Sequence, residues 1–142
     1  MTQQPVSSSR SAPNAAIAAA IQEHLTDGNL DCADAFAIAL NERATPRAVG
    51  ENADMLSIRL ARCQLGLFGY PGKKGWEGAG VTILAVPEGL EAAITAAKNP
   101  DGRLTCVAAW RLADRFGVSR MQVGWIAENM AVKIVSCQLG AF

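Results

Sequence analysis

The sequence predicts a mainly α-helical protein with short β segments, and two observations lead to that fold class. First, half of the 142 residues are hydrophobic and only 18% are charged, which suffices for a packed core and excludes a globally disordered chain. Second, one segment occurs twice, and each copy carries start and stop signals for helices. We therefore expect the same helical unit twice in one chain.

The repeat has an offset of 74 residues. It aligns residues 15–68 with residues 89–142 without a gap, and 16 of the 54 aligned residues are identical. Composition alone would give about four or five identities. A gapless repeat predicts the same fold twice, packed as an intrachain pseudo-dimer. The identities include Gly28/Gly102, Leu30/Leu104, Cys32/Cys106, Val49/Val123, Gly50/Gly124, and the block Cys-Gln-Leu-Gly at 63–66 and 137–140.

The repeat divides the chain into four segments. These are a flexible polar tail (1–14), the first repeat (15–68), a Gly/Pro-rich linker (69–88) and the second repeat (89–142). In the linker, Val81–Val86 is β-prone and Pro87 is placed to open the next helix. No apolar run is long enough to span a membrane and no secretory signal is indicated. We expect a cytoplasmic protein with reduced thiols and no membrane partner.

The second repeat predicts three helices. The first covers Glu88–Lys98 and ends at the turn formed by residues 99–102. Thr105 is a suitable N-cap for the second helix, Cys106–Phe116, which Gly117 stops. The apolar residues on the inward face of this second helix are Ala109, Leu112, Ala113 and Phe116.

The third predicted helix begins after Ser119 and runs to about Met130. Its inward residues are Val123, Ile126 and Ala127, and Val132–Cys137 follows as an extended segment. In the first repeat, Asp31 stands where Thr105 stands. Thr45 stands where Ser119 stands, with Pro46 at the first helical position.

The run Leu112-Ala113, Phe116-Gly117-Val118, Val123 and Ile126 resembles the helix-turn-helix of prokaryotic regulators. The following β segment makes each repeat similar to a winged helix. The first copy departs from the pattern, since Arg43 replaces the turn glycine. The paired Cys-Gln-Leu-Gly blocks are similar to those of uncharacterised bacterial proteins built from this repeat. The resemblance implies two tandem winged-helix-turn-helix-like repeats, and double-stranded DNA as a partner of a transcriptional regulator.

The third helix of the second repeat would then enter the major groove. Arg and Gln or Asn side chains read base edges there, and an exposed Trp is more typical of a protein interface. Two linker lysines would assist at phosphates. The candidate DNA-binding residues are Arg115, Ser119, Arg120, Gln122, Trp125, Asn129, Lys73 and Lys74.

Charge distinguishes the two repeats and supports an alternative function. The net charge of the chain is zero, but residues 15–68 carry seven acidic and four basic residues, giving −3. Residues 89–142 carry six basic and four acidic residues, giving +2. DNA contact is therefore expected at the second repeat. The alternative is a non-enzymatic adaptor that binds a protein partner through the first repeat or Trp125. A homodimer is also compatible with the sequence.

The four cysteines form equivalent pairs, Cys32/Cys63 and Cys106/Cys137. Four thiols can bind zinc, which leaves a metal or redox sensor as a weaker third hypothesis. However, structural metal sites use closely spaced pairs, whereas here 31 residues separate the members of each pair. We expect core thiols and no cofactor.

The sequence does not predict an enzyme. It contains one histidine, His24, and no clustered carboxylates. The glycine-rich linker also fails the phosphate-loop pattern, because Leu67 stands at the first glycine and Lys74 at the Ser/Thr position.

Overall fold

The computed structural model describes residues 13–71, 74–78 and 86–142. In this part of the chain the structure is mainly helical with short strands, which confirms the predicted class. Most of the predicted tail, Lys73 and residues 81–85 of the β-prone run lie outside the described residues. Of the described helices, none has both the length and the apolar composition needed to cross a membrane.

The chain forms two compact units whose composition differs from that of the sequence repeats. Unit 1 contains the residues up to Ala61 together with Leu139–Ala141. Unit 2 contains Arg62–Gln138 together with Phe142. Residues 62–68, which end the first repeat in sequence, therefore belong to unit 2, and residues 139–141 of the second repeat belong to unit 1.

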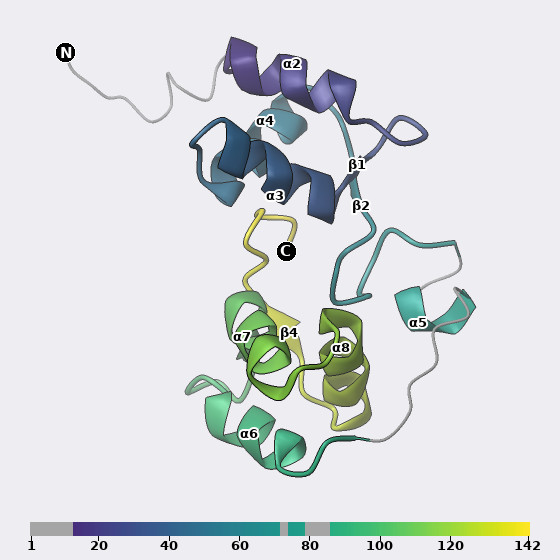
Figure 1. The fold of residues 1–142 in the computed structure, drawn as a ribbon, viewed down its shortest axis with the longest axis vertical. Helices are drawn as coiled ribbons and strands as arrows, with labels where there is room; N and C mark the ends of the chain where they lie inside the picture. Colours follow the sequence, from purple (N-terminus) through teal and green to yellow (C-terminus); the bar gives the residue numbers. More distant parts are fainter. Residues whose placement is uncertain (1–12, 72–73, 79–85) are drawn as a thin grey trace, which may run out of the picture. The chain divides into compact units, whose positions relative to one another are not determined.

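Unit 1 is a three-helix unit with a two-stranded parallel sheet, in which Leu30 pairs with Leu60. All three helices pack on one another (Figure 1). Its elements are α2 (Ala15–Glu23), β1 (Leu30–Asp31), α3 (Cys32–Asn41), α4 (Pro46–Met55) and β2 (Leu60–Ala61).

Unit 2 repeats this order after a short additional helix. Helices α6, α7 and α8 pack on one another, and Leu104 pairs with Ile134 in a parallel sheet. Its elements are α5 (Gly75–Gly78), α6 (Leu90–Ala97), β3 (Leu104–Thr105), α7 (Cys106–Phe116), α8 (Arg120–Asn129) and β4 (Ile134–Val135).

The predicted helix caps are present at most helix starts. Thr105 Oγ1 accepts from Ala108 N at 3.2 Å, and Thr45 Oγ1 accepts from Ala48 N at 3.0 Å. Ser119 and Gln122 form a complete capping box at α8. Asp31 occupies the N-cap position of α3, but its side chain makes no capping hydrogen bond.

The structure corrects the start of the first helix of unit 2. Pro87 is not the first helical residue, because its carbonyl accepts from Leu90 N at 3.2 Å in a turn. Gly89 is the N-cap with φ +89°, a conformation open mainly to glycine. Helix α6 thus begins at Leu90, after the predicted Glu88, and ends at Ala97.

The extended segment after α8 is also shorter than predicted. Of Val132–Cys137, only Ile134 and Val135 pair with another strand. Ser136 follows at φ +58°, which turns the chain away from the sheet. Strand β4 pairs with β3 in parallel. The wing of a winged helix, by contrast, is an antiparallel hairpin.

The two repeats have closely similar backbones. The hydrogen bond from Leu30 N to Arg59 O corresponds to that from Leu104 N to Lys133 O, at 2.9 and 3.0 Å. Five pairs of equivalent residues share a positive φ, and half of these ten residues are not glycine. The pairs are Gly28/Gly102, Arg43/Gly117, Ser57/Ala131, Arg62/Ser136 and Gly66/Gly140.

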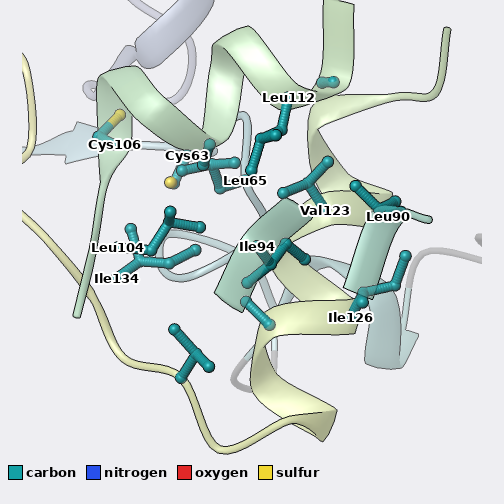
Figure 2. Close-up of a cluster of buried hydrophobic side chains, with 14 residues drawn as sticks. Cys63, Leu65, Leu90, Ile94, Leu104, Cys106, Leu112, Val123, Ile126 and Ile134 are labelled. Carbon is teal, nitrogen blue, oxygen red and sulfur yellow. The ribbon is translucent and has the colours of Figure 1, made fainter. Parts of the chain in front are cut away.

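The core of unit 2 gathers side chains from its three long helices and both strands (Figure 2). The predicted inward residues Val123, Ile126 and Ala127 are buried, as are Ala109, Leu112 and Ala113. Cys63 and Leu65 complete this core, although both residues belong to the first repeat in sequence. The segment that follows β2 is therefore an integral part of unit 2.

Candidate functional site

In a helix-turn-helix protein, the helix equivalent to the third helix of each unit is the one that contacts DNA bases. In α8, Val123, Ile126 and Ala127 face the core. At 3.6 residues per turn, the opposite face carries Met121, Trp125 and Glu128, with Gly124 at its edge. A major groove would meet this outer face.

Part of the outer face of α8, at Met121 and Gly124, is covered by unit 2 itself, whereas Glu128 is exposed. Gly124 lies against the backbone of Leu65, so closely that a Cβ at this position would overlap the Leu65 carbonyl group. Gly66 lies against Met121 and the Trp76 ring, and α5 packs on α8. Glycine is therefore required at residue 124, because the helix and the turn formed by residues 63–66 meet backbone to backbone.

Unit 1 contains the same contact. Gly50 of α4 lies against the backbone of Leu139, and a Cβ there would overlap the Leu139 carbonyl group. Gly140 follows at φ +84°, next to the guanidinium of Arg47. Each third helix thus packs at its glycine against a Leu-Gly turn.

The two Leu-Gly segments are exchanged between the repeats. Leu65 ends the first repeat but packs on the third helix of the second. Leu139 ends the second repeat but packs on the third helix of the first. We call Leu65-Gly66 and Leu139-Gly140 the exchanged segments.

The strongest candidate for base contact, Arg120, is used within unit 2. Its Nη1 donates to Gln64 Oε1 at 2.6 Å. Its guanidinium carbon lies 3.6 Å from the centre of the Trp110 ring, in a close cation–π contact. Arg120 therefore fixes the exchanged segment to α7 and α8.

Three other candidates also have local roles. Ser119 Oγ accepts from Gln122 N at 3.1 Å, and Gln122 Oε1 accepts from Ser119 N at 3.0 Å. Asn129 Nδ2 donates to the carbonyl of Trp125 at 2.9 Å, within the helix. Ser119 and Gln122 therefore stabilise the start of α8.

The remaining candidates are dispersed. Trp125 is half-buried and packs against the hydrophobic core of unit 2. Arg115 is exposed at the end of α7, 5.2 Å from the centre of the Phe116 ring. The ammonium of Lys74 lies 6.0 Å from the centre of the Trp76 ring. Lys73 lies outside the described residues.

All four cysteines are buried, and none of them forms a disulfide bond. Burial raises the pKa of Cys63 and of Cys106, although hydrogen bonds from Leu67 and Gln138 partly oppose this effect. Gln138 Nε2 donates to the Cys106 sulfur at 3.4 Å. No group of three metal-ligating side chains occurs among the described residues. His24 Nδ1 lies 2.7 Å from the carbonyl oxygen of Ala20 in its own helix.

Sequence analysis missed three participants in this arrangement. These are Gln64, Trp110 and the glycine pair Gly50/Gly124. The glycines were visible as identities of the repeat, and a glycine in the middle of a helix signals a close packing contact. Gln64 also lies in the repeated Cys-Gln-Leu-Gly block, but its partner could not be read from spacing.

No family model, curated protein or solved structure is significantly similar to this chain.

Proposed function

We propose that the chain is a non-enzymatic protein-interaction adaptor, built from two tandem helix-turn-helix-like repeats that form an intrachain pseudo-dimer. One observation carries the proposal: the third helix of each unit packs, at a buried glycine, against the backbone of a Leu-Gly turn. The same docking geometry occurs twice, at equivalent residues. In this chain the helix-turn-helix scaffold therefore recognises protein segments.

The chemistry of the third helices supports this proposal over insertion into DNA. The outer face of α8 presents Met121, Trp125 and Glu128, and the corresponding residues of α4 are Arg47, Glu51 and Asp54. Carboxylates on such a face repel phosphates. Arg120, the cation closest to this face in α8, already bonds Gln64.

The surface offered to a partner is on α3 of unit 1. Ala33, Ala37 and Leu40 lie on one side of this helix and are exposed, Leu40 to 81%. The equivalent residues of α7 are Val107, Arg111 and Asp114, so the second unit is charged there. Because residues 15–68, which include α3, carry a net charge of −3, the matching partner is an apolar protein ridge flanked by Lys or Arg.

Affinity capture with the tagged full chain, followed by binding of the purified partner, tests this proposal. Leu40→Asp introduces the residue that α7 carries at the equivalent position and should weaken partner binding at least about tenfold. Val107→Asp is the matched control on α7 and should leave the affinity unchanged. A captured partner that binds the Leu40→Asp variant as tightly as wild type would overturn the assignment of this surface.

A transcriptional regulator is the second candidate, and it is favoured by the net charge of +2 in residues 89–142. Fluorescence anisotropy of a labelled random DNA duplex at about 50 and 150 mM salt measures the DNA binding that this function requires. Binding that weakens with salt and with Arg115→Ala would support DNA contact. We expect no binding at the lower salt concentration, because part of the outer face of α8 is covered and the exposed Glu128 on this face repels phosphates.

A further inference from the structure

Unit 2 contains a cavity of about 580 Å³ beside the covered face of α8. One wall is the last half of α8, with Gly124 and Glu128. A second wall is the turn and strand that follow α8, including Val132 and Ile134. The opposite wall is aromatic and aliphatic, formed by Leu67, Phe68 and Phe142, and Lys74 and Lys133 also line the space.

The aromatic part of the lining favours a planar apolar group. The rings of Phe68 and Phe142 stand edge to face, with centroids 6.0 Å apart and an interplanar angle of 87°. Two aromatic rings at this angle present a face and an edge to a third ring between the walls. The volume falls within the range of small-molecule sites, about 300–1,000 Å³.

The charges of the cavity favour an anion. Its lining includes two lysines, Lys74 and Lys133, and one glutamate, Glu128. The side chains of the lining thus carry a net charge of +1, which attracts a carboxylate, and the flexible lysines can reach it as hydrogen-bond donors. An amine of the same shape would have only Glu128 as an oppositely charged partner in this lining.

We propose that this cavity is a binding site for a small aromatic carboxylate. The aromatic body lies between the two phenylalanines and the aliphatic wall, and the carboxylate faces Lys74 and Lys133. Two residues of the wall, Leu67 and Phe68, follow directly on Leu65-Gly66, so an occupant also holds this exchanged segment on α8. This site does not depend on the partner surface of α3.

Calorimetric titration of the full chain with 2-naphthoate tests the site, with the neutral 2-naphthamide as the ligand of matched shape. The carboxylate should bind about five- to tenfold more tightly than the amide, as expected for partly exposed ion pairs. The double variant Lys74→Gln/Lys133→Gln should remove this preference. The control Lys98→Gln/Arg103→Gln changes two exposed cations elsewhere in unit 2 and should keep it.

Methyl NMR locates the bound probe. The methyl resonances of Val132 and Ile134 should shift on titration, and those of Ile17 and Ile21 in unit 1 should not. Absence of binding at millimolar probe, equal binding of acid and amide, or shifts confined to other methyl groups would each overturn the proposal. None of these outcomes affects the test at Leu40, so the site and the adaptor function fail independently.

Discussion

In unit 1 the first helix begins on polar contacts, whereas in unit 2 it begins on glycine. Asn14 Oδ1 caps α2 through Ile17 N at 3.0 Å, and Asn14 N donates to Asn52 Oδ1 at 2.6 Å. In unit 2 the residue equivalent to Asn52 is the buried Ile126, and α6 starts after Gly89 at φ +89°. The same helix packing is thus reached through one buried amide or through one apolar side chain.

The turns between the second and third helices differ in the same way. Gly117 adopts φ +65° at this turn, and Arg43 adopts φ +54° in unit 1. At this turn a residue other than glycine is tolerated, because the positive φ costs it only about 1 kcal/mol. At Gly50 and Gly124 the residue is the same in both units, because any side chain would overlap a carbonyl group. The comparison separates positions that need glycine from those that merely favour it.

The largest effect is expected at the glycines under the exchanged segments. Gly124→Ala should destabilise the protein by about 2 kcal/mol, since overpacking against backbone costs about 3 kcal/mol and the better helix propensity of alanine returns about 1 kcal/mol. Gly50→Ala should behave alike in unit 1. Urea denaturation measures both. A gain in stability, as for alanine in an exposed helix, would contradict the docking contact.

The buried amide of unit 1 should rank next. Asn52→Ala removes the acceptor for Asn14 N and the donor to the Ala48 carbonyl, which lies at 2.8 Å. We expect a loss of about 1–2 kcal/mol in the free energy of unfolding, because one buried polar contact is left unmade. Asn14→Ala removes only the cap on Ile17 N, because the contact with Asn52 uses the backbone N–H of Asn14, so the double variant Asn14→Ala/Asn52→Ala should cost about the sum of the single variants. A double variant that costs clearly less than this sum would show that the Asn14 side chain also supports the contact with Asn52.

Arg120 distinguishes a structural role from DNA contact. Arg120→Ala should lower stability by about 1–1.5 kcal/mol, since it removes a hydrogen bond to Gln64 and the contact with Trp110. Thermal unfolding without any ligand is the measurement. The matched control is Arg115→Ala, at an exposed residue. Equal stability of wild type and Arg120→Ala would assign this side chain to an external ligand instead.

The smallest effect concerns the turn of unit 1. Arg43→Gly should stabilise the protein by about 0.5–1 kcal/mol, because glycine adopts a positive φ without the cost that a Cβ adds. The reciprocal change, Gly117→Ala in unit 2, should destabilise by a similar amount. Chemical denaturation of the pair tests the equivalence of the two turns. A loss of stability with Arg43→Gly would indicate that the arginine side chain supports unit 1.

Local chemistry made most helices predictable from the sequence. Thr45, Thr105 and Ser119 cap the helices that they were expected to cap, and Gly117 stops α7 where predicted. The start of α6 was misplaced, because Pro87 occupies a turn that a sequence signal for a first helical residue cannot distinguish. Caps and stops depend on neighbours within four residues, which is why they can be read locally.

The composition of the candidate site could not be predicted in the same way. The sequence showed that Cys-Gln-Leu-Gly occurs twice, but not which helix each block contacts. Docking of Leu65 on α4 or on α8 would satisfy the same local pattern, since Gly50 and Gly124 are equivalent. The choice depends on the connection between the units, which is a tertiary property. The role of Arg120 followed from this choice and was missed for the same reason.

The most direct test is nuclear Overhauser contact between the third-helix glycines and the leucines of the exchanged segments. The proposed geometry predicts cross peaks from Gly124 Hα to Leu65 Hα and from Gly50 Hα to Leu139 Hα. A Cβ built on each glycine would lie 3.4 and 3.3 Å from the respective leucine Cα. Cross peaks from Gly50 to Leu65 and from Gly124 to Leu139 would instead place each segment on its own repeat and contradict the exchange.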